Sequence, residues 1–585
     1  MRKPLSKAGP VPLAQKLSAV RAALRARPVA LQAPYPAVTL FFSVCDGFSR
    51  ARVVNASGPS LESAWQSGLS ALRPLLKEAG LQGRWVRVDR VEGVKETNWK
   101  QLRAILAATK RNYFRHGLAL DAGLANAFLE EELNANAMLY GGNAVEHAVL
   151  NERNFSLYAR ARYPGLDAPG FRDEAPVFVL STRGVFCDEA GRLHELNGPG
   201  PNAGRRHVER LDEAGLLSMI EDASAYLARQ VKADGSFVYG WHPCFDRPIG
   251  TYNTLRHAST TYAMVEAFEV TRDARLGAAI ERSLAHLTGA LIHTRALPGG
   301  GEAAFLVDTG DEIKLGGNAV AILALAKHAQ VTGARAHLPL MEKLALGIAH
   351  MQDKASGAFV HVLKAGDLSV KQGFRTIYYE GEAAFALMRL YALTKDSRWL
   401  AMVERAFEHF IAQEHWKHHD HWLGYCVDEL TRHRPEERYF RFAIRNVADH
   451  LDFVANRITT FPTLLELMMA ARRTLARIDS MPQMRPLLAQ VDLVRFEAAL
   501  QKRAHHLLNG HFWPELAMFF RKPDRIAGSF FIRHHAFRVR IDDVEHYLSG
   551  FVAYWNDLSE TAMPRNEVAI RRPAGAQGIK TSCGS

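Results

Sequence analysis

The sequence lacks long hydrophobic runs and paired cysteines. Its longest apolar stretches, such as Pro36–Cys45, fall far short of the roughly 18–20 residues that a membrane-spanning helix needs. The five cysteines are scattered along the chain, and no Cys-x-x-Cys motif occurs. We therefore expect no membrane span and no disulfide framework, and the cysteine usage fits the reducing cytoplasm.

The sequence also lacks the motifs of nucleic-acid recognition. There is no zinc finger, no recognition-helix pattern and no basic stripe interleaved with aromatic residues, so we do not expect a nucleic-acid partner. The formal net charge is nevertheless +12, with a pI near 9.4. Such a balance favours an anionic partner but does not by itself select one. Our expectation is an anionic carbohydrate or another small-molecule substrate, and the sequence does not indicate an oligomeric state.

The N-terminal segment, residues 1–35, is basic. Leu13, Leu17, Val20 and Leu24 lie at helical spacing, while arginines interrupt any apolar core that a secretory signal would require. An ordinary amphipathic helix or a loose basic tail is favoured here over a membrane-surface anchor.

Residues 36–200 predict a small α/β domain. The segment Glu195–Arg206 is rich in glycine, proline and asparagine and is the best linker candidate. Strands are predicted at Val38–Val44, Ala51–Val54 and Trp85–Asp89, with a strand pair at Val177–Leu180 and Gly184–Cys187. Helices are predicted at Leu61–Glu78, kinked or ended by Pro74, and at Trp99–Thr109 and Leu124–Leu139.

After the linker the sequence is almost wholly helical and repetitive. A Thr-x-Asp-x-Arg element occurs at Thr271–Arg275 and at Thr394–Arg398, each time between an apolar and an amphipathic helix. It predicts a tight turn whose aspartate caps the next helix. A second repeat, Gln-x-x-x-Asp/Ser-Gly, is followed by an aromatic residue in Gln230–Val238 and in Gln352–Val360.

Two classes of helix alternate in this region. One class is apolar nearly all round, which indicates burial on every side, and the other carries a single apolar stripe. The apolar helices begin near Asn253, Gly317, Glu380, Asp420, Thr463 and Asp543; the amphipathic ones span Glu213–Gln230, Arg275–Ile292, Leu338–Met351, Trp399–Glu414, Glu437–Asn456 and Met484–Leu508. Six buried and six outer helices are what an (α/α)6 toroid requires. We predict this toroid over residues 207–560, followed by a flexible C-terminal tail at 561–585.

These repeats resemble those of the (α/α) toroid superfamilies, which include six-hairpin glycosidases, sugar epimerases, polysaccharide lyases and terpenoid cyclases. The resemblance covers roughly residues 211–555 and is architectural. The Asp-x-Asp-Asp acid motif of the cyclases and the Cys/Cys-His metal set of lanthionine cyclases are both absent. The resemblance implies one central pocket but does not imply a particular reaction.

Polar and aromatic residues gather where the predicted inner helices begin. Because inner helices of a toroid run in one direction, their N-terminal ends surround one mouth, where we predict the site. Our candidates for acid–base catalysis are Glu380, Asp420 and His257, and our candidates for substrate binding are Trp241, Tyr252, Asn253, Arg256, Asn318, Arg375, Tyr379, Glu382, His421, Trp422, Arg540 and Asp543. Helix capping is the alternative for Asn253, Asp420 and Asp543. The helix dipole alone would explain acidic residues such as Glu380 and Glu382.

Two chemistries fit these residue types. A pair of carboxylates, for example Glu380 with Asp420, suits glycoside hydrolysis, and the tryptophans and tyrosines would stack on sugar rings. Arg256 and Asn253 with His257 are instead the types that a uronate lyase or epimerase uses to neutralise a carboxylate and move protons.

Metal binding is a third option at His415-x-x-His418-His419-x-His421. These histidines have no carboxylate or cysteine partner at a fixed spacing, so we expect neither a metal nor another cofactor.

The sequence therefore predicts an enzyme of the glycoside hydrolase, lyase or epimerase class that acts on an acidic or anionic glycan or its precursor. The alternatives are a non-catalytic scaffold that binds a polymer in a biosynthetic complex, and a terpenoid-type cyclase.

Overall fold

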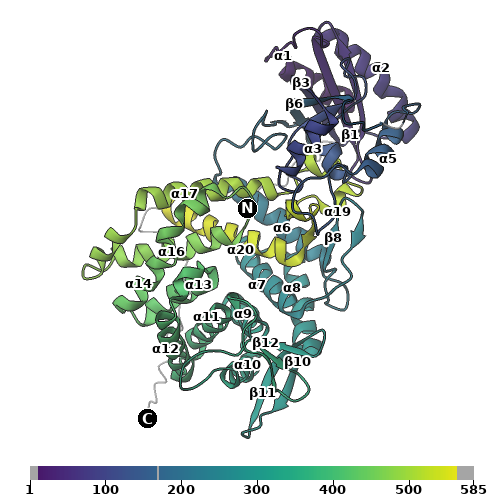
Figure 1. Cartoon of the computed structure of the whole chain (residues 1–585). Helices are drawn as coiled ribbons and strands as arrows, with labels where there is room; N and C mark the ends of the chain where they lie inside the picture. Colours follow the sequence, from purple (N-terminus) through teal and green to yellow (C-terminus); the bar gives the residue numbers. More distant parts are fainter. Residues whose placement is uncertain (1–10, 168–169, 563–585) are drawn as a thin grey trace, which may run out of the picture.

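The computed structural model describes residues 11–167 and 170–562 (Figure 1). The predicted tail at 561–585 lies almost entirely outside these residues, and so does the beginning of the basic segment 1–35. The described part of that segment contains helix α1 (Leu13–Arg25), whose Val20 and Leu24 pack into the core under the first sheet. Among the described residues, no helix combines the length and apolarity needed to cross a membrane.

One antiparallel sheet dominates the N-terminal part, with the strand order β2-β1-β3-β6-β4-β5 and β7 paired to β6. The strands are β1 (Val38–Cys45), β2 (Arg52–Gly58), β3 (Trp85–Asn98), β4 (Gly117–Ala119), β5 (Ala127–Phe128), β6 (Pro176–Cys187) and β7 (Leu193–Glu195). Strand β1 is buried on both faces, because Leu40 and Phe42 pack toward α1 and α2 (Leu61–Ala79) while Phe41 joins the core that continues into the helical part.

Two predictions for this part are corrected, and a third is refined. The expected strand pair at 177–187 is one continuous strand, β6, because β3 extends to Asn98 and pairs with it along its whole length. Pro74 does not end helix α2, which spans Leu61–Ala79 and so matches the predicted helix at Leu61–Glu78; Pro74 lies on the solvent side, where the carbonyl four residues earlier, left without an N–H partner, can be hydrated. The helix expected at 124–139 is reduced to α4 (Glu130–Ala135), because the Asp121 carboxylate accepts from the backbone N–H groups of Ala125 and Asn126 and holds them in a turn.

The C-terminal part is an (α/α)6 toroid, as predicted. Contacts between neighbours run from α7 through α9, α11, α13, α16 and α20 back to α7, so six inner helices close a ring. The inner helices are α7 (Thr254–Thr271), α9 (Leu315–Thr332), α11 (Tyr378–Thr394), α13 (His421–His433), α16 (Thr463–Asp479) and α20 (Ile541–Ala562). The outer helices are α6 (Glu213–Gln230), α8 (Ala274–His286), α10 (Leu338–His350), α12 (Ser397–Ala412), α14 (Glu437–Arg445) and α17 (Leu493–Leu507). Figure 1 shows the ring below the sheet-containing part.

Burial and capping explain this arrangement. Helix α9 is buried at every residue from Leu315 to Ala329, whereas α8 buries one stripe that includes Leu276, Ile280 and Leu284. The Thr-x-Asp turns act as predicted, since the carboxylate of Asp273 accepts from the Leu276 N–H at 2.8 Å and caps α8.

Two small sheets that the sequence did not predict hold the segments leading into the inner helices. In one, β15 (Val539–Arg540) pairs with β8 (Gly240–His242), which in turn pairs with β9 (Arg247–Pro248), so the start of α20 is tied to the segment before α7. The other has the strand order β10 (Ile292–Ala296), β11 (Glu302–Asp308), β12 (Glu312–Lys314), β13 (Val362–Lys364) and β14 (Val370–Gln372).

The chain between α17 and α20 leaves the ring and packs against the N-terminal sheet. It contains α18 (Pro514–Ala517) and α19 (Pro523–Ile526), and the Ala51 N–H donates to the Met518 carbonyl at 2.8 Å. Arg206, at the end of the predicted linker, makes two 2.8 Å hydrogen bonds to the buried carboxylate of Glu515. The segment at 195–206 is thus a packed interface between the two parts.

Candidate active site

A pocket of about 390 Å³ opens where the inner helices begin. Its walls come from the N-terminal ends of α7, α11, α13, α16 and α20 and from the segments that precede them. The lining residues are Asn253, Leu255, Arg256, Ser259, Thr376, Tyr378, Tyr379, Glu382, His421, Trp422, Phe461, Pro462, Thr463, Ile532, Arg540, Asp542, Asp543, Glu545 and His546. A pocket of this size accommodates a small molecule such as a mono- or disaccharide.

His546 is a strongly perturbed group in the pocket. Its Nδ1 lies 2.9 Å from Glu466 Oε2 and 3.7 Å from Glu545 Oε1. Burial alone would lower the pKa of His546, but the two carboxylates outweigh it and raise the pKa to about 10. His546 is therefore an imidazolium at neutral pH, with Nδ1–H directed at Glu466 and Nε2–H available to a ligand.

His421 faces His546 across the pocket, with 5.5 Å between the ring centroids. Its Nδ1 lies 3.3 Å from Asp420 Oδ1, and its Nε2 is buried without a hydrogen-bond partner. With the ring proton on Nδ1, facing the carboxylate, Nε2 is the acceptor nitrogen of the ring, and it lies 4.0 Å from Glu466 Oε2. Asp420 itself caps α13, accepting from the Trp422 N–H at 3.0 Å, so the helix start fixes the carboxylate that orients the ring.

Two carboxyl groups in the pocket have raised pKa values. Burial raises the pKa of Glu382 well above its usual value, and the neighbouring carboxylates of Asp420 and Glu545 add to this; its Oε2 has no hydrogen-bond partner. Burial also raises the pKa of Glu545 to about 7, although it accepts a 2.7 Å hydrogen bond from the Ser259 hydroxyl. Both can therefore donate a proton near neutral pH.

The arginines of the pocket are already paired with aspartates. Arg256 Nε lies 2.9 Å from Asp542 Oδ2, and Arg540 Nη2 lies 3.0 Å from both Asp542 and Asp543. Their charge is largely neutralised within the protein, so the pocket presents no surplus of positive charge to a substrate carboxylate.

The structure brings eight of the predicted site residues into this pocket. They are Asn253, Arg256, Tyr379, Glu382, His421, Trp422, Arg540 and Asp543. Asn253 also caps α7, accepting from the Arg256 N–H at 3.0 Å. Asn253 therefore both caps a helix and lines the pocket.

Other predicted residues lie outside the pocket wall. Glu380 turns away, with its carboxylate 3.2 Å from His415 and 3.8 Å from His361. His257 is fully buried between α7 and α8. Its Nδ1 and the Tyr252 hydroxyl lie 2.8 Å apart and share a hydrogen bond. Of the three predicted acid–base residues, only Asp420 lies next to the pocket, with its carboxylate 3.3 Å from His421 Nδ1.

Four predicted binders lie outside the pocket and make contacts within the fold: Tyr252, bonded to His257, and Asn318, Arg375 and Trp241. Asn318 accepts from the Leu306 N–H at 2.8 Å and donates to the Ala304 carbonyl, joining α9 to β11. Arg375 pairs with Glu312 at 2.6 Å, and the Trp241 ring lies under the Arg525 guanidinium, 4.1 Å from its carbon.

His546 stands among the polar residues at the start of the last inner helix but is not one of the predicted site residues, and Glu545 and Glu466 were missed altogether. Glu466 lies at the end of the first turn of α16, and Glu545 and His546 lie in the second turn of α20. A helix turn is about 5.4 Å long, so residues one turn into an inner helix can still reach the pocket floor. The signal in the sequence that could have indicated these residues is a polar residue within an otherwise apolar inner helix.

His421, Glu466 and His546 could also hold a divalent cation, since one ligand atom from each lies within 4.8 Å of the others. The site would require His546 to lose its proton and its ion pair with Glu466. The sequence prediction of no metal remains a prediction.

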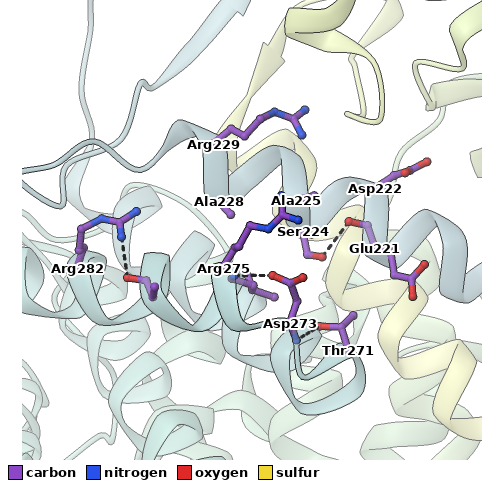
Figure 2. Close-up of a pocket in the computed structure, with 12 residues that line it drawn as sticks. Glu221, Asp222, Ser224, Ala225, Ala228, Arg229, Thr271, Asp273, Arg275 and Arg282 are labelled. Atoms are coloured by element: carbon purple, nitrogen blue, oxygen red, sulfur yellow. Dashed lines mark hydrogen bonds between the residues drawn. The ribbon is translucent and has the colours of Figure 1, made fainter. Parts of the chain in front are cut away.

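A second, larger groove of about 690 Å³ lies on the outside of the ring between α6 and α8 (Figure 2). Its polar groups mainly serve their own helices. Asp273 caps α8, Ser224 donates to the Glu221 carbonyl and Arg282 donates to the Ala278 carbonyl. This groove has no convergent set of reactive groups.

No protein-family model and no curated protein sequence matches this chain. Solved structures resemble part of this chain. A D-mannose isomerase is 13% identical, with a TM-score of 0.45 over 61% of this chain and 100% of its own. The cellobiose 2-epimerase of Bacillus thermoamylovorans B4167 is 10% identical, with a TM-score of 0.44 over 59% and 100%. The unsaturated glucuronyl hydrolase of Streptococcus agalactiae is 13% identical, with a TM-score of 0.40 over 60% and 94%. Likeness at this level says nothing about what this chain binds or converts.

Proposed function

We propose that this protein is a carbohydrate-active enzyme that moves a proton on the carbon next to the carbonyl group of an open-chain sugar, as an isomerase or epimerase does. The observation that carries the proposal is the imidazole pair: His421, whose buried Nε2 has no hydrogen-bond partner, and His546, held as an imidazolium, with 5.5 Å between the ring centroids. A base and an acid side by side in one pocket are the two groups that such a proton transfer needs.

The proposed reaction assigns one role to each residue. His421 Nε2 takes the proton from the carbon, whose electron pair forms the carbon–carbon double bond of an enediol as the carbonyl oxygen gains charge. His546 donates its Nε2 hydrogen bond or proton to that oxygen, and Glu466 stabilises the imidazolium. In an epimerisation a proton then returns to the opposite face of the same carbon, and the enediol oxygen gives its proton back to His546 as the carbonyl re-forms. In an isomerisation the proton goes to the former carbonyl carbon, while the neighbouring enediol hydroxyl loses its proton and becomes the new carbonyl. Trp422 and Tyr378 offer ring faces to the sugar.

The charge of the pocket bears on the substrate. Because Arg256 and Arg540 are paired with aspartates, a neutral reducing sugar fits the pocket better than an anionic one. The anionic glycan that the net charge suggested remains the alternative substrate. The many charged groups in the pocket disfavour a terpenoid-type cyclase, which would need a dry, aromatic cavity. Because these groups converge on one pocket, they also disfavour a non-catalytic scaffold.

Glycoside hydrolysis is the second candidate function, favoured by the buried, protonated Glu382. Its carboxyl group would donate a proton to the leaving oxygen, with another carboxylate acting as base or nucleophile.

Deuterium exchange distinguishes the two reactions. The protein would be incubated in D2O with neutral reducing mono- and disaccharides and with uronates, and the products followed by proton NMR. We expect loss of the C2 proton signal and the appearance of an isomeric sugar, reduced about 10²–10⁴-fold in His421→Asn. His350→Asn, an exposed histidine on α10, is the matched control. Release of a new reducing end without deuterium at carbon would establish hydrolysis instead, and the absence of both would refute the proposal.

A further inference from the structure

A second pocket, of about 600 Å³, lies where the N-terminal part meets the ring, distinct from the pocket with the two histidines. One wall is the end of α3 (Trp99–Ala107) and the segment that follows it to His116. The opposite wall is the segment after α15 (Leu451–Asn456) together with the side of α17.

This pocket is lined by cations without carboxylates. Lys110, Arg115, Arg457 and Lys502 all contribute to its surface, and no aspartate or glutamate does. Within the described part of the chain, no carboxylate oxygen lies within 4.0 Å of the charged nitrogens of these four side chains. Most of the buried arginines described elsewhere do have a carboxylate partner, as Arg87 has in Asp89.

Arg115 shows most clearly that a counter-charge is missing. Its Nη1 is shielded from solvent and has no hydrogen-bond partner. The carboxylate of Glu130 attracts Arg115 but is already paired with Arg533 and Arg205. Burial, with repulsion from Arg533 and Arg205, holds the pKa of Arg115 well below its usual value, which an anion in the pocket would reverse.

The rest of the wall is apolar. Phe114 is buried beneath the pocket, and Ile105 and Ile458 remain 39% and 58% exposed at its edge. Exposed isoleucines beside cations that have no carboxylate partner offer contact area to a ligand that carries both an anionic group and an apolar or flat body. Lys502 and Arg457 make hydrogen bonds to the neutral side chains of Asn456 and Thr459, which leave their charge uncompensated.

We infer that this interface pocket binds a small phosphorylated molecule with at least two negative charges and an apolar or aromatic body, of the chemical class of a nucleoside diphosphate. Guanidinium and ammonium groups are the usual ligands of phosphoryl oxygens, and the volume suits a nucleotide rather than a polymer. Because Arg115 belongs to the N-terminal part and Arg457 and Lys502 to the ring, the bound anion would join the two. The inference is independent of the reaction proposed for the other pocket.

The test is calorimetric titration of the full chain with uridine diphosphate and with inorganic pyrophosphate at constant ionic strength. We expect saturable binding of both, tighter for the nucleotide. Lys110→Glu and Lys502→Glu should each weaken binding at least tenfold, since a hydrogen bond to a charged group contributes more than about 1.4 kcal/mol. Both lysines are exposed, so these variants should fold.

Lys354→Glu, an exposed lysine after α10, makes the same change in net charge elsewhere and is the matched control. His546→Asn should leave nucleotide binding unchanged, which separates this site from the proposed active site. Absence of binding, or equal weakening by the control, would overturn the inference. If pyrophosphate bound as tightly as the nucleotide, the apolar wall would contribute nothing to binding, and that part of the inference would be wrong.

Discussion

At the scale of single residues, the charge state of His546 decides what the pocket can do. Its pKa is raised from 6.5 to about 10 in the folded protein, so the imidazolium stabilises the fold fully below pH 6.5 and loses this contribution as the pH rises toward 10. We expect activity to fall on the alkaline side near pH 10. An NMR titration of the imidazole, assigned by comparison with His546→Asn, measures the pKa directly. A midpoint near 6.5 would remove the acid from the proposed reaction.

Glu382 has the opposite effect on stability. Its pKa is raised above 4.5 by burial, so the folded protein loses stability as the pH rises above 4.5, because the unfolded chain ionises more readily. Glu382→Gln is neutral at every pH and nearly isosteric. We expect the variant to be more stable than the wild type toward urea at pH 8 but not at pH 4, and to lose activity if Glu382 donates a proton. Equal stabilisation at both pH values would mean that the wild-type carboxyl group is not perturbed.

At the scale of elements, the sequence predicted the twelve ring helices to within a few residues of most ends, because hydrophobic periodicity reports directly on burial. It did not predict the strands β8 to β15, since most are only two to five residues long and depend on partners distant in sequence. The same limit applies to the site. Eight lining residues were selected from helix starts, but Glu466 and His546 pair across α16 and α20, and no local pattern encodes that contact.

The close approach of α9 and α11 gives a prediction at this scale. A Cβ at Gly316 would collide with the Glu382 carboxylate, whereas a Cβ at the neighbouring Gly317 would meet only an ordinary contact at 3.4 Å from Leu306. We expect Gly316→Ala to destabilise the protein by about 1–3 kcal/mol through overpacking, measured by urea denaturation. Gly317→Ala, the control, should be neutral or stabilising by up to about 1 kcal/mol, as alanine favours a helix. Similar effects at both positions would argue against a tight fit around Glu382.

At the scale of the whole molecule, the predicted linker proves to be part of an interface. Side chains from β1 and β3 join the same continuous core as the ring helices, and the chain between α17 and α20 supplies the surface on which the sheet packs. A glycine- and proline-rich stretch usually separates domains, but Arg205 and Arg206 within it are buried or half-buried and bonded to carboxylates on both sides. Composition could not reveal those partners, because Glu131 and Glu515 lie 74 and 309 residues away.

This interface predicts that the sheet and the ring unfold together. Glu515 is fully buried and holds Arg206 with two hydrogen bonds, so Glu515→Gln leaves a guanidinium without its counter-charge and should cost about 3 kcal/mol. Glu497→Gln, which breaks the more exposed pair with Arg472, should cost no more than about 1 kcal/mol. Hydrogen exchange read by mass spectrometry would follow both parts during urea unfolding. Coincident transitions, shifted together by Glu515→Gln, are the expected result because the two parts share one core. If the sheet instead lost protection at lower urea than the ring, the segment at 195–206 would be a true domain boundary and the anion pocket beside it would open before the ring unfolds.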